Sequence, residues 1–256
     1  GIGLGMMLDK GNSILFVKQL DFLLLALDQI CNTYNYIRAT NYKEDLGSFT
    51  IISIVCDHGF QGPQSSLNAG GDFSSIANLP VYCLNEFADI TEIINSELLK
   101  PGFRILTISQ RAIPNSVEMD NLISISSDKS IFHYLDGDLF TMVCVNFSLN
   151  RYSSRIKNIY KSNIRFDLFH INYFPGQNYE MILESVRKTK RLIIIDDSKS
   201  NTKLADNLVS KLVSMNTRFD LINLHRETLN DNDYAVCHDQ PDINFEKIIN
   251  RWIEKV

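Results

Sequence analysis

The sequence has no run of basic residues, no closely spaced cysteine pair and no apolar run of membrane-spanning length. Its 25 lysines and arginines stand against 30 acidic residues, which gives a formal net charge of −5. Binding to a nucleic-acid backbone requires a basic stripe, so we expect no nucleic acid among the partners.

The longest apolar run, residues 14–27, is interrupted by Lys18, Gln19 and Asp21. A spanning helix needs ~20 consecutive apolar residues. We therefore expect no membrane segment. The sequence opens at Gly1 within a glycine-rich pattern, so we also expect no signal peptide here and further residues upstream.

The five cysteines lie far apart, mostly within apolar stretches. This arrangement is typical of reduced core residues in a cytoplasmic protein. The histidines are also scattered without the spacing of metal ligands, so we expect no metal site on this chain.

Apolar runs of two kinds alternate along the 256 residues, short β-rich runs and longer amphipathic ones. This alternation predicts an α/β protein with two domains, each a mostly parallel sheet flanked by helices. The boundary is placed in the polar stretch 111–130, giving domains 1–128 and 129–256.

The predicted strands are short apolar runs at 48–56, 80–84, 103–109, 122–125, 139–147, 166–171, 191–196 and 219–224. The predicted helices cover 21–36, 86–99, 149–162, 179–188, 202–215 and 245–255. Asn85 is the expected N-cap of the second helix.

The opening GIGLGMMLDKG superficially resembles a dinucleotide-binding fingerprint. That motif requires a preceding strand and the spacing GxGxxG, and neither is present. A glycine-rich helix packed closely against a neighbour is the favoured interpretation.

Taken whole, residues 1–30 combine this helix with a turn, a short apolar strand at 14–17 and the segment QLDFLLLALDQI. The order resembles the pyrimidine-binding domain of transketolases, deoxyxylulose-phosphate synthases and the beta subunits of 2-oxoacid dehydrogenase decarboxylating components. Asp21, Phe22 and the pair Asp28 and Gln29 carry the match.

The resemblance continues through GFQGPQSS and NLPVYCLNEFADITEII. In the second half, LDGDLFTMVCVN and INYFPGQNYEMILESVRKTKRLIIIDD are similar to the transketolase C-terminal domain. The resemblance implies that thiamine diphosphate binds between chains and that Phe22 packs on its aminopyrimidine ring.

The family's diphosphate-binding signature begins Gly-Asp-Gly and ends in asparagines. Gly71 and Asp72 are followed by Phe73 instead of the third residue of this signature, a glycine. Gly137 and Asp138 are followed by Leu139, and we interpret them as a hairpin turn. The resemblance therefore implies that an alpha-type partner holds the magnesium and the diphosphate, and that the isolated chain is inactive.

The family's catalytic glutamate would fall upstream of Gly1, and its loop histidine is replaced here by Gln64, Ser65 and Ser66. His58 is the nearby imidazole that could donate or accept a proton at neutral pH. The alternative is a solvated loop histidine.

Asp196 and Asp197 follow an apolar strand, a place where open α/β sheets bind ligands. A helix-capping or interface role is favoured, and the ligand role stays open.

The resemblance implies a beta-type subunit for 2-oxoacid decarboxylation and dehydrogenation or for ketol transfer, in a hetero-oligomer or dimer. An acyltransferase component is a further possible partner. The alternative is a non-catalytic pseudosubunit that keeps only the fold and the assembly interface.

Overall fold

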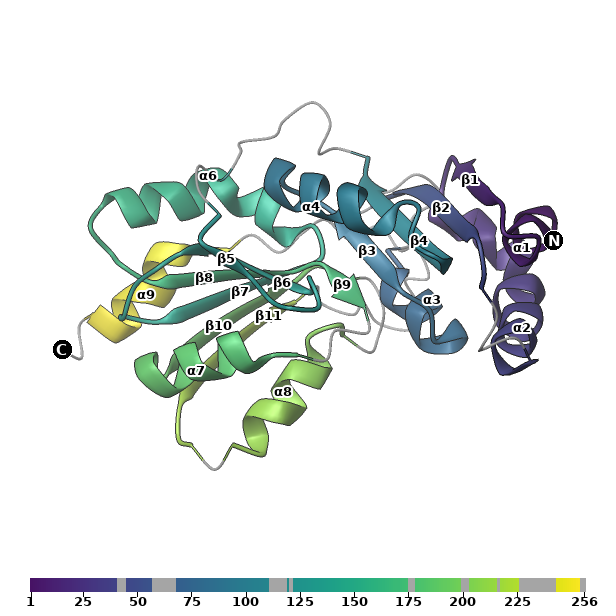
Figure 1. The fold of residues 1–256 in the computed structure, drawn as a ribbon. Helices are drawn as coiled ribbons and strands as arrows, with labels where there is room; N and C mark the ends of the chain where they lie inside the picture. Colours follow the sequence, from purple (N-terminus) through teal and green to yellow (C-terminus); the bar gives the residue numbers. More distant parts are fainter. Residues whose placement is uncertain are drawn as a thin grey trace, which may run out of the picture.

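The computed structural model describes residues 1–40, 45–56, 68–110, 119, 122–174, 178–198, 203–215, 217–225 and 243–253. Within them the chain forms two sheets, each mostly parallel and flanked by helices (Figure 1). The predicted fold class is confirmed.

The first sheet contains β1 (Asn12–Val17), β2 (Ser48–Val55), β3 (Val81–Leu84), β4 (Gly102–Ser109) and β9 (Tyr173–Phe174). Their order is β1-β2-β4-β3-β9. The first four strands run parallel, whereas β9 pairs antiparallel with β3. Because β9 comes from the second half of the chain, it joins the two halves through backbone pairing.

The second sheet contains β5 (Ser124–Ile125), β6 (Ile131–Leu135), β7 (Thr141–Val145), β8 (Asp167–Ile171), β10 (Arg191–Asp196) and β11 (Asp220–His225). Their order is β11-β10-β7-β8-β6-β5. Strands β7, β8, β10 and β11 are parallel, and β6 is antiparallel to β8 and β5. Since β5 lies before residue 128 and β9 after it, the sheets exchange short strands around the expected boundary, which stays a prediction.

Gly137 does not form a hairpin turn, contrary to expectation. The flanking strands β6 and β7 are not neighbours, because β8 lies between them. A Cβ on Gly137 would meet the backbone of Arg165 and Phe166 at 2.1–2.5 Å. The glycine is therefore required by a close approach of two backbone segments rather than by a tight turn.

The helices are α1 (Ile2–Leu8), α2 (Tyr34–Thr40), α3 (Gly70–Ala77), α4 (Phe87–Glu97), α6 (Ser148–Lys161), α7 (Glu180–Thr189), α8 (Asp206–Val213) and α9 (Phe245–Ile253). Figure 1 shows α7 and α8 on one face of the second sheet and α6 with α9 on the other. No helix in the described part of the chain is long and apolar enough to span a membrane.

Both faces of the central strands β7, β8 and β10 are buried, which explains their apolar character. On β7, Met142 and Cys144 belong to one apolar core, and Val143 and Val145 belong to the other. Each core also includes residues of the first sheet. The two halves therefore share their apolar interior.

The cysteines within the described ranges are buried and free of disulfides, as expected for reduced core residues: Cys31, Cys56, Cys83 and Cys144. Cys237 lies outside those ranges.

Gly47, at the entry to β2, offers a test of the close packing around α1 and β1. A Cβ on Gly47 would meet the carbonyl oxygen of Gly11 at 2.0 Å and the carbonyl carbon of Lys10 at 2.6 Å. Because backbone atoms cannot yield as a flexible side chain does, Gly47→Ala is expected to lower the free energy of unfolding by ~1–3 kcal/mol. Denaturant unfolding measures the change.

Gly5→Ala is the matched control, since an added Cβ on this helical glycine meets nothing within 4 Å. Replacing it is expected to stabilise the chain by ~0.5–1 kcal/mol through helix propensity. Equal effects of the two substitutions would contradict the packing described here.

Candidate functional site

The carboxyl ends of the parallel strands gather at one edge of the first sheet. β1 leads into a 3-10 helix, η1 (Leu20–Ala26), β2 is followed by Cys56, and β4 ends at Ser109. The Ser53 hydroxyl on β2 donates to the carbonyl oxygen of Val17 at the end of β1 (3.1 Å). Open α/β sheets bind their ligands at this edge, which is therefore the candidate functional site.

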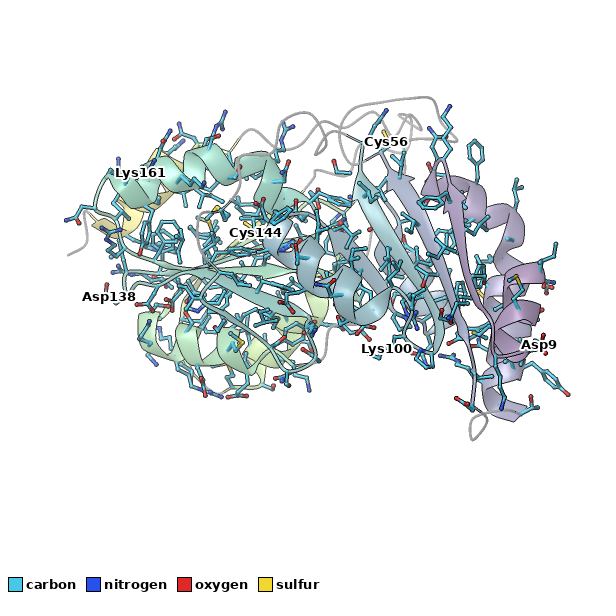
Figure 2. The ribbon with its side chains drawn as sticks, turned by 45° about the horizontal axis from the view of Figure 1, so that its top comes forward. Asp9, Cys56, Lys100, Asp138, Cys144 and Lys161 are labelled. Carbon is cyan, nitrogen blue, oxygen red and sulfur yellow. The ribbon has the colours of Figure 1, made fainter. Side chains whose placement is uncertain are left out.

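The two edges of this sheet are visible in Figure 2. Cys56 lies at one end of the sheet, and Lys100 and Asp9 lie at the opposite end, where β4 and β1 begin. The carboxyl edge is thus well separated from the amino edge.

In the helix η1, every third side chain lies on the same face. Leu20 and Leu23 are buried, and Ala26 packs against the same core. Phe22 and Leu25, also three apart, are 44% and 90% exposed. A 3-10 helix aligns every third side chain, so one row enters the core and another faces outward.

The prediction of one α-helix over residues 21–36 is wrong. The chain forms the 3-10 helix η1, then a π-helical segment η2 (Gln29–Thr33), and only then α2. The apolar residues here surround the whole helix axis, and one α-helical stripe against the sheet cannot bury them all. The 3-10 turn buries Leu20, Asp21 and Leu23 and leaves Phe22, Leu24 and Leu25 exposed.

Exposed large apolar side chains concentrate in the first 25 residues. Nine of the sixteen such residues in the described part of the chain lie there, and we call these nine the N-terminal apolar surface: Ile2, Met6, Leu8, Ile14, Leu15, Phe16, Phe22, Leu24 and Leu25. Strand β1, which supplies three of them, pairs only with β2 among the described strands and is the edge of its sheet. Large exposed apolar patches and edge strands are typical of interaction surfaces.

His58 lies outside the described residues, as do Gln64, Ser65 and Ser66. Its segment leaves the sheet after Cys56 at the carboxyl edge, the same edge at which β1 leads into η1 with Phe22. The catalytic role of His58 stays a prediction.

Asn68 follows that segment and lies buried between the sheets. It accepts a hydrogen bond from Asn146 Nδ2 (2.8 Å) and donates to the carbonyl oxygen of Asp197 (3.4 Å). Both bonds reach residues that follow strands of the second sheet. The carboxyl edge of that sheet is thus covered by the first half of the chain.

The carboxylates of Asp196 and Asp197 accept backbone N–H groups. Asp196 accepts from Ser198 (2.9 Å) and from Ala205 (2.8 Å) at the start of α8, and Asp197 accepts from Phe147 (3.2 Å) at the start of α6. Both side chains are fully buried. The contacts support the favoured capping and interface role.

Residues that follow β3 form a buried polar cluster against the second sheet. The N-cap of α4 is Glu86, not the expected Asn85. Asp89 Oδ1 accepts the backbone N–H groups of Asn85 (3.2 Å) and Glu86 (2.8 Å). The Asp89 carboxylate thus satisfies two backbone donors at the start of the helix. The N-cap therefore lies one residue later than the sequence predicted.

His170 on β8 meets Asp89 inside this cluster, and both side chains are fully buried. His170 Nε2 lies 2.7 Å from the carbonyl oxygen of Asn146, so this nitrogen carries a hydrogen and donates it. His170 Nδ1 lies 3.0 Å from Asp89 Oδ2. This close contact links α4 to β8 and so joins the two sheets.

Glu86 and Tyr134 lie close to this pair. Burial is the main cause that raises the pKa of Glu86 to about 7, and the negative charge of Asp89 adds to the rise. Burial also raises the pKa of the Tyr134 hydroxyl. Neither Glu86 Oε1 nor the Tyr134 hydroxyl has a hydrogen-bond partner among the described residues.

A second cluster of titratable groups, His133, Asp136 and Asp167, lies at the amino end of β8. Lys188 Nζ already lies 3.0 Å from Asp167 Oδ2 and 3.9 Å from Asp136 Oδ1. His133 Nε2 bonds the carbonyl oxygen of Leu135 (2.7 Å), so it carries a hydrogen rather than a lone pair for a metal. The cluster is a lysine-centred charge network.

Sequence analysis singled out Phe22 as a cofactor-binding residue but missed the buried polar cluster. A signal was present, because His170 and Tyr134 each interrupt an apolar strand, and a buried polar side chain requires a partner. The partners, Glu86 and Asp89, are far away in the sequence and come together only in the folded chain.

No protein-family model matches the sequence, and no curated protein matches it. Solved structures do match. One is described as a split gene transketolase, an inactive beta4 tetramer, with a TM-score of 0.62 and 12% identity over 100% of this chain and 79% of that one.

Another is transketolase from Campylobacter jejuni subsp. jejuni NCTC 11168, with a TM-score of 0.51 and 12% identity. The match covers 80% of this chain but only 31% of that enzyme. The chain therefore has a transketolase-like fold, as the resemblance in sequence implied.

Phe22→Ala and Leu23→Ala form a matched pair that tests the orientation of η1. Leu23 is 4% exposed and packs in the core, so its truncation is expected to lower the free energy of unfolding by ~2–5 kcal/mol. Phe22 is 44% exposed, so its truncation should lower it by less than ~1.5 kcal/mol. Thermal and denaturant unfolding measure both, and a larger loss for Phe22 than for Leu23 would contradict the orientation.

Proposed function

We propose that this chain is a beta-type subunit of a thiamine-diphosphate enzyme and contributes the pyrimidine side of the cofactor site. The supporting observation is the exposed ring of Phe22 at the carboxyl edge of a sheet with transketolase-like fold. An aromatic ring that faces outward from a rigid sheet edge can pack on a flat heterocycle.

The residues present fit an aminopyrimidine ring better than they fit a diphosphate. Phe22, Leu24 and Leu25 on η1 give the site an apolar wall. The sequence lacks the Gly-Asp-Gly signature with its trailing asparagines. We therefore assign magnesium and diphosphate to an alpha-type partner and expect the isolated chain to be inactive.

Thiamine diphosphate, when bound, supplies the thiazolium carbon that takes up an acyl or ketol fragment. This chain's own part is to hold the pyrimidine ring against Phe22 and to exclude water through the apolar side chains of η1. The proton-transfer role assigned to His58 belongs to the same proposal, because its segment starts at Cys56 on this edge.

Ketol transfer is the reaction favoured by the similar structures, since both carry the name transketolase. Decarboxylation of a 2-oxoacid, with transfer to an acyltransferase component, is the second candidate reaction, and it rests on the order of motifs alone. A non-catalytic pseudosubunit is the second candidate function, because one similar protein is described as inactive.

The cofactor assignment predicts a specific loss of affinity. In the complete complex, Phe22→Ala should weaken binding of thiamine diphosphate by ~1–3 kcal/mol, the contribution of one aromatic contact and its buried area. Calorimetry measures the affinity. Tyr36→Ala on α2, an exposed aromatic outside the N-terminal apolar surface, is the control and should leave the affinity unchanged.

If Phe22→Ala bound the cofactor as tightly as the unaltered complex, the assignment would be wrong. Binding of the cofactor with no detectable turnover of 2-oxoacid or ketose by the complete complex would favour the pseudosubunit.

We further propose that the N-terminal apolar surface is an assembly interface. Leu25 is its most exposed member at 90%, and one similar protein is described as a beta4 tetramer. A buried charge at such an interface is strongly unfavourable, so Leu25→Asp should weaken assembly by roughly 2 kcal/mol, or about 30-fold in Kd. Sedimentation velocity across a concentration series measures the change.

Val213→Asp on α8 is the control, because Val213 is 75% exposed and lies outside this surface. It should leave assembly unchanged. The interface assignment would be wrong if the unaltered chain and both variants were monomers at every concentration. It would also be wrong if Leu25→Asp assembled as strongly as the unaltered chain.

A further inference from the structure

The start of α4 penetrates between the two sheets and brings buried carboxyl groups there. Glu86 and Asp89 are 2% and 0% exposed. Their helix follows β3 of the first sheet, and Asp89 faces His170 on β8 of the second. A change of charge in this cluster therefore acts on the contact between the two halves of the chain.

Glu86 has an incomplete set of hydrogen-bond donors. Its side chain takes part in the capping box with Asp89 at the start of α4, and its Oε2 accepts the backbone N–H of Met119 (3.0 Å), but its Oε1 has no partner among the described residues. An ionised carboxylate that is buried in this way lacks the donors that water would supply, whereas a protonated carboxyl group tolerates burial better.

The charged and titratable groups that face Glu86 come from four elements. Asp89 on α4 repels its negative charge, while His170 on β8 and Lys157 on α6 attract it. Tyr134 on β6 is the fourth group, and its hydroxyl has no partner. The attraction from His170 and Lys157 is weaker than the effect of burial.

We propose that Glu86 is a proton-controlled latch between the two sheets. With the proton bound, the start of α4 stays closed against the second sheet. Loss of the proton leaves a buried carboxylate with one unsatisfied oxygen, and this favours an opened junction in which water reaches Glu86. The latch does not depend on the cofactor assignment.

The pH range follows from the two states of this one group. In the closed junction the pKa of Glu86 is raised to about 7, and in an opened, hydrated junction it approaches the ordinary value of 4.5. The closed state is therefore most stable relative to the open state at a pH below about 4.5. As pH rises between the two values, opening becomes about tenfold more favourable per pH unit, and above about pH 7 it changes no further.

Hydrogen exchange of the full chain tests the latch, with Glu86→Gln as the variant. Glutamine keeps an oxygen for the Met119 N–H but cannot ionise. The ratio of exchange rates between the unaltered chain and the variant, taken at each pH, removes the intrinsic pH dependence of exchange. At Met119 and at the start of α4, this ratio should rise roughly tenfold or more from about pH 5.5 to about pH 8. Amides of β10, remote from Glu86, should show no such rise.

Glu180→Gln on α7, where the carboxylate is exposed, is the matched control and should follow the unaltered chain. A carbon-13 NMR titration of the Glu86 carboxyl group in the unaltered chain gives the same answer without a variant, with a midpoint expected near 7. A constant ratio across the pH series, an equal rise in β10, or a midpoint near 4.5 would overturn the proposal.

Discussion

The buried pair of Asp89 and His170 is the contact on which the arrangement of the two sheets depends. It lies at the start of α4 and joins the first sheet to β8 of the second. Around it, the backbone N–H of Cys83 on β3 donates to the carbonyl oxygen of Asn172 (2.7 Å), and β9 continues the first sheet. Apolar contacts alone would allow the halves to slide, whereas buried polar contacts must align or leave donors and acceptors unsatisfied.

The two carboxyl edges differ in a way that assigns them different roles. The edge of the second sheet is covered by Asn68 and used by Asp196 and Asp197 to hold helix starts. The edge of the first sheet carries exposed apolar side chains on η1. We therefore propose the first edge for ligand binding and assembly, whereas the second edge serves the internal structure.

The fold could be predicted from the sequence because the central parallel strands are buried on both faces. Strands β2, β4 and β10 are rich in apolar residues for this reason, and their predicted bounds agree with the structure within one residue. Strand β6 was missed because it carries a histidine and a tyrosine, and α3 was missed because it begins with two glycines and is short. Strand β6 and helix α3 are both stabilised by tertiary contacts, which the local pattern of apolar residues does not reveal.

The candidate site could be predicted only in part. Phe22 was identified through the order of motifs, and its exposure follows from the 3-10 geometry of η1, which apolar periodicity did not indicate. The polar cluster joins Asp89 to His170, which are 81 positions apart by their numbers, so no spacing in the sequence connects them. Such clusters are a property of tertiary structure.

The most direct test of the account is a structure of this chain with its natural partner, purified together and supplied with thiamine diphosphate and magnesium. We predict that the aminopyrimidine ring lies on Phe22 at the carboxyl edge of the first sheet, and that residues of the partner hold the diphosphate. A complex in which protein side chains alone cover η1 and the cofactor is bound elsewhere, or not at all, would contradict the account.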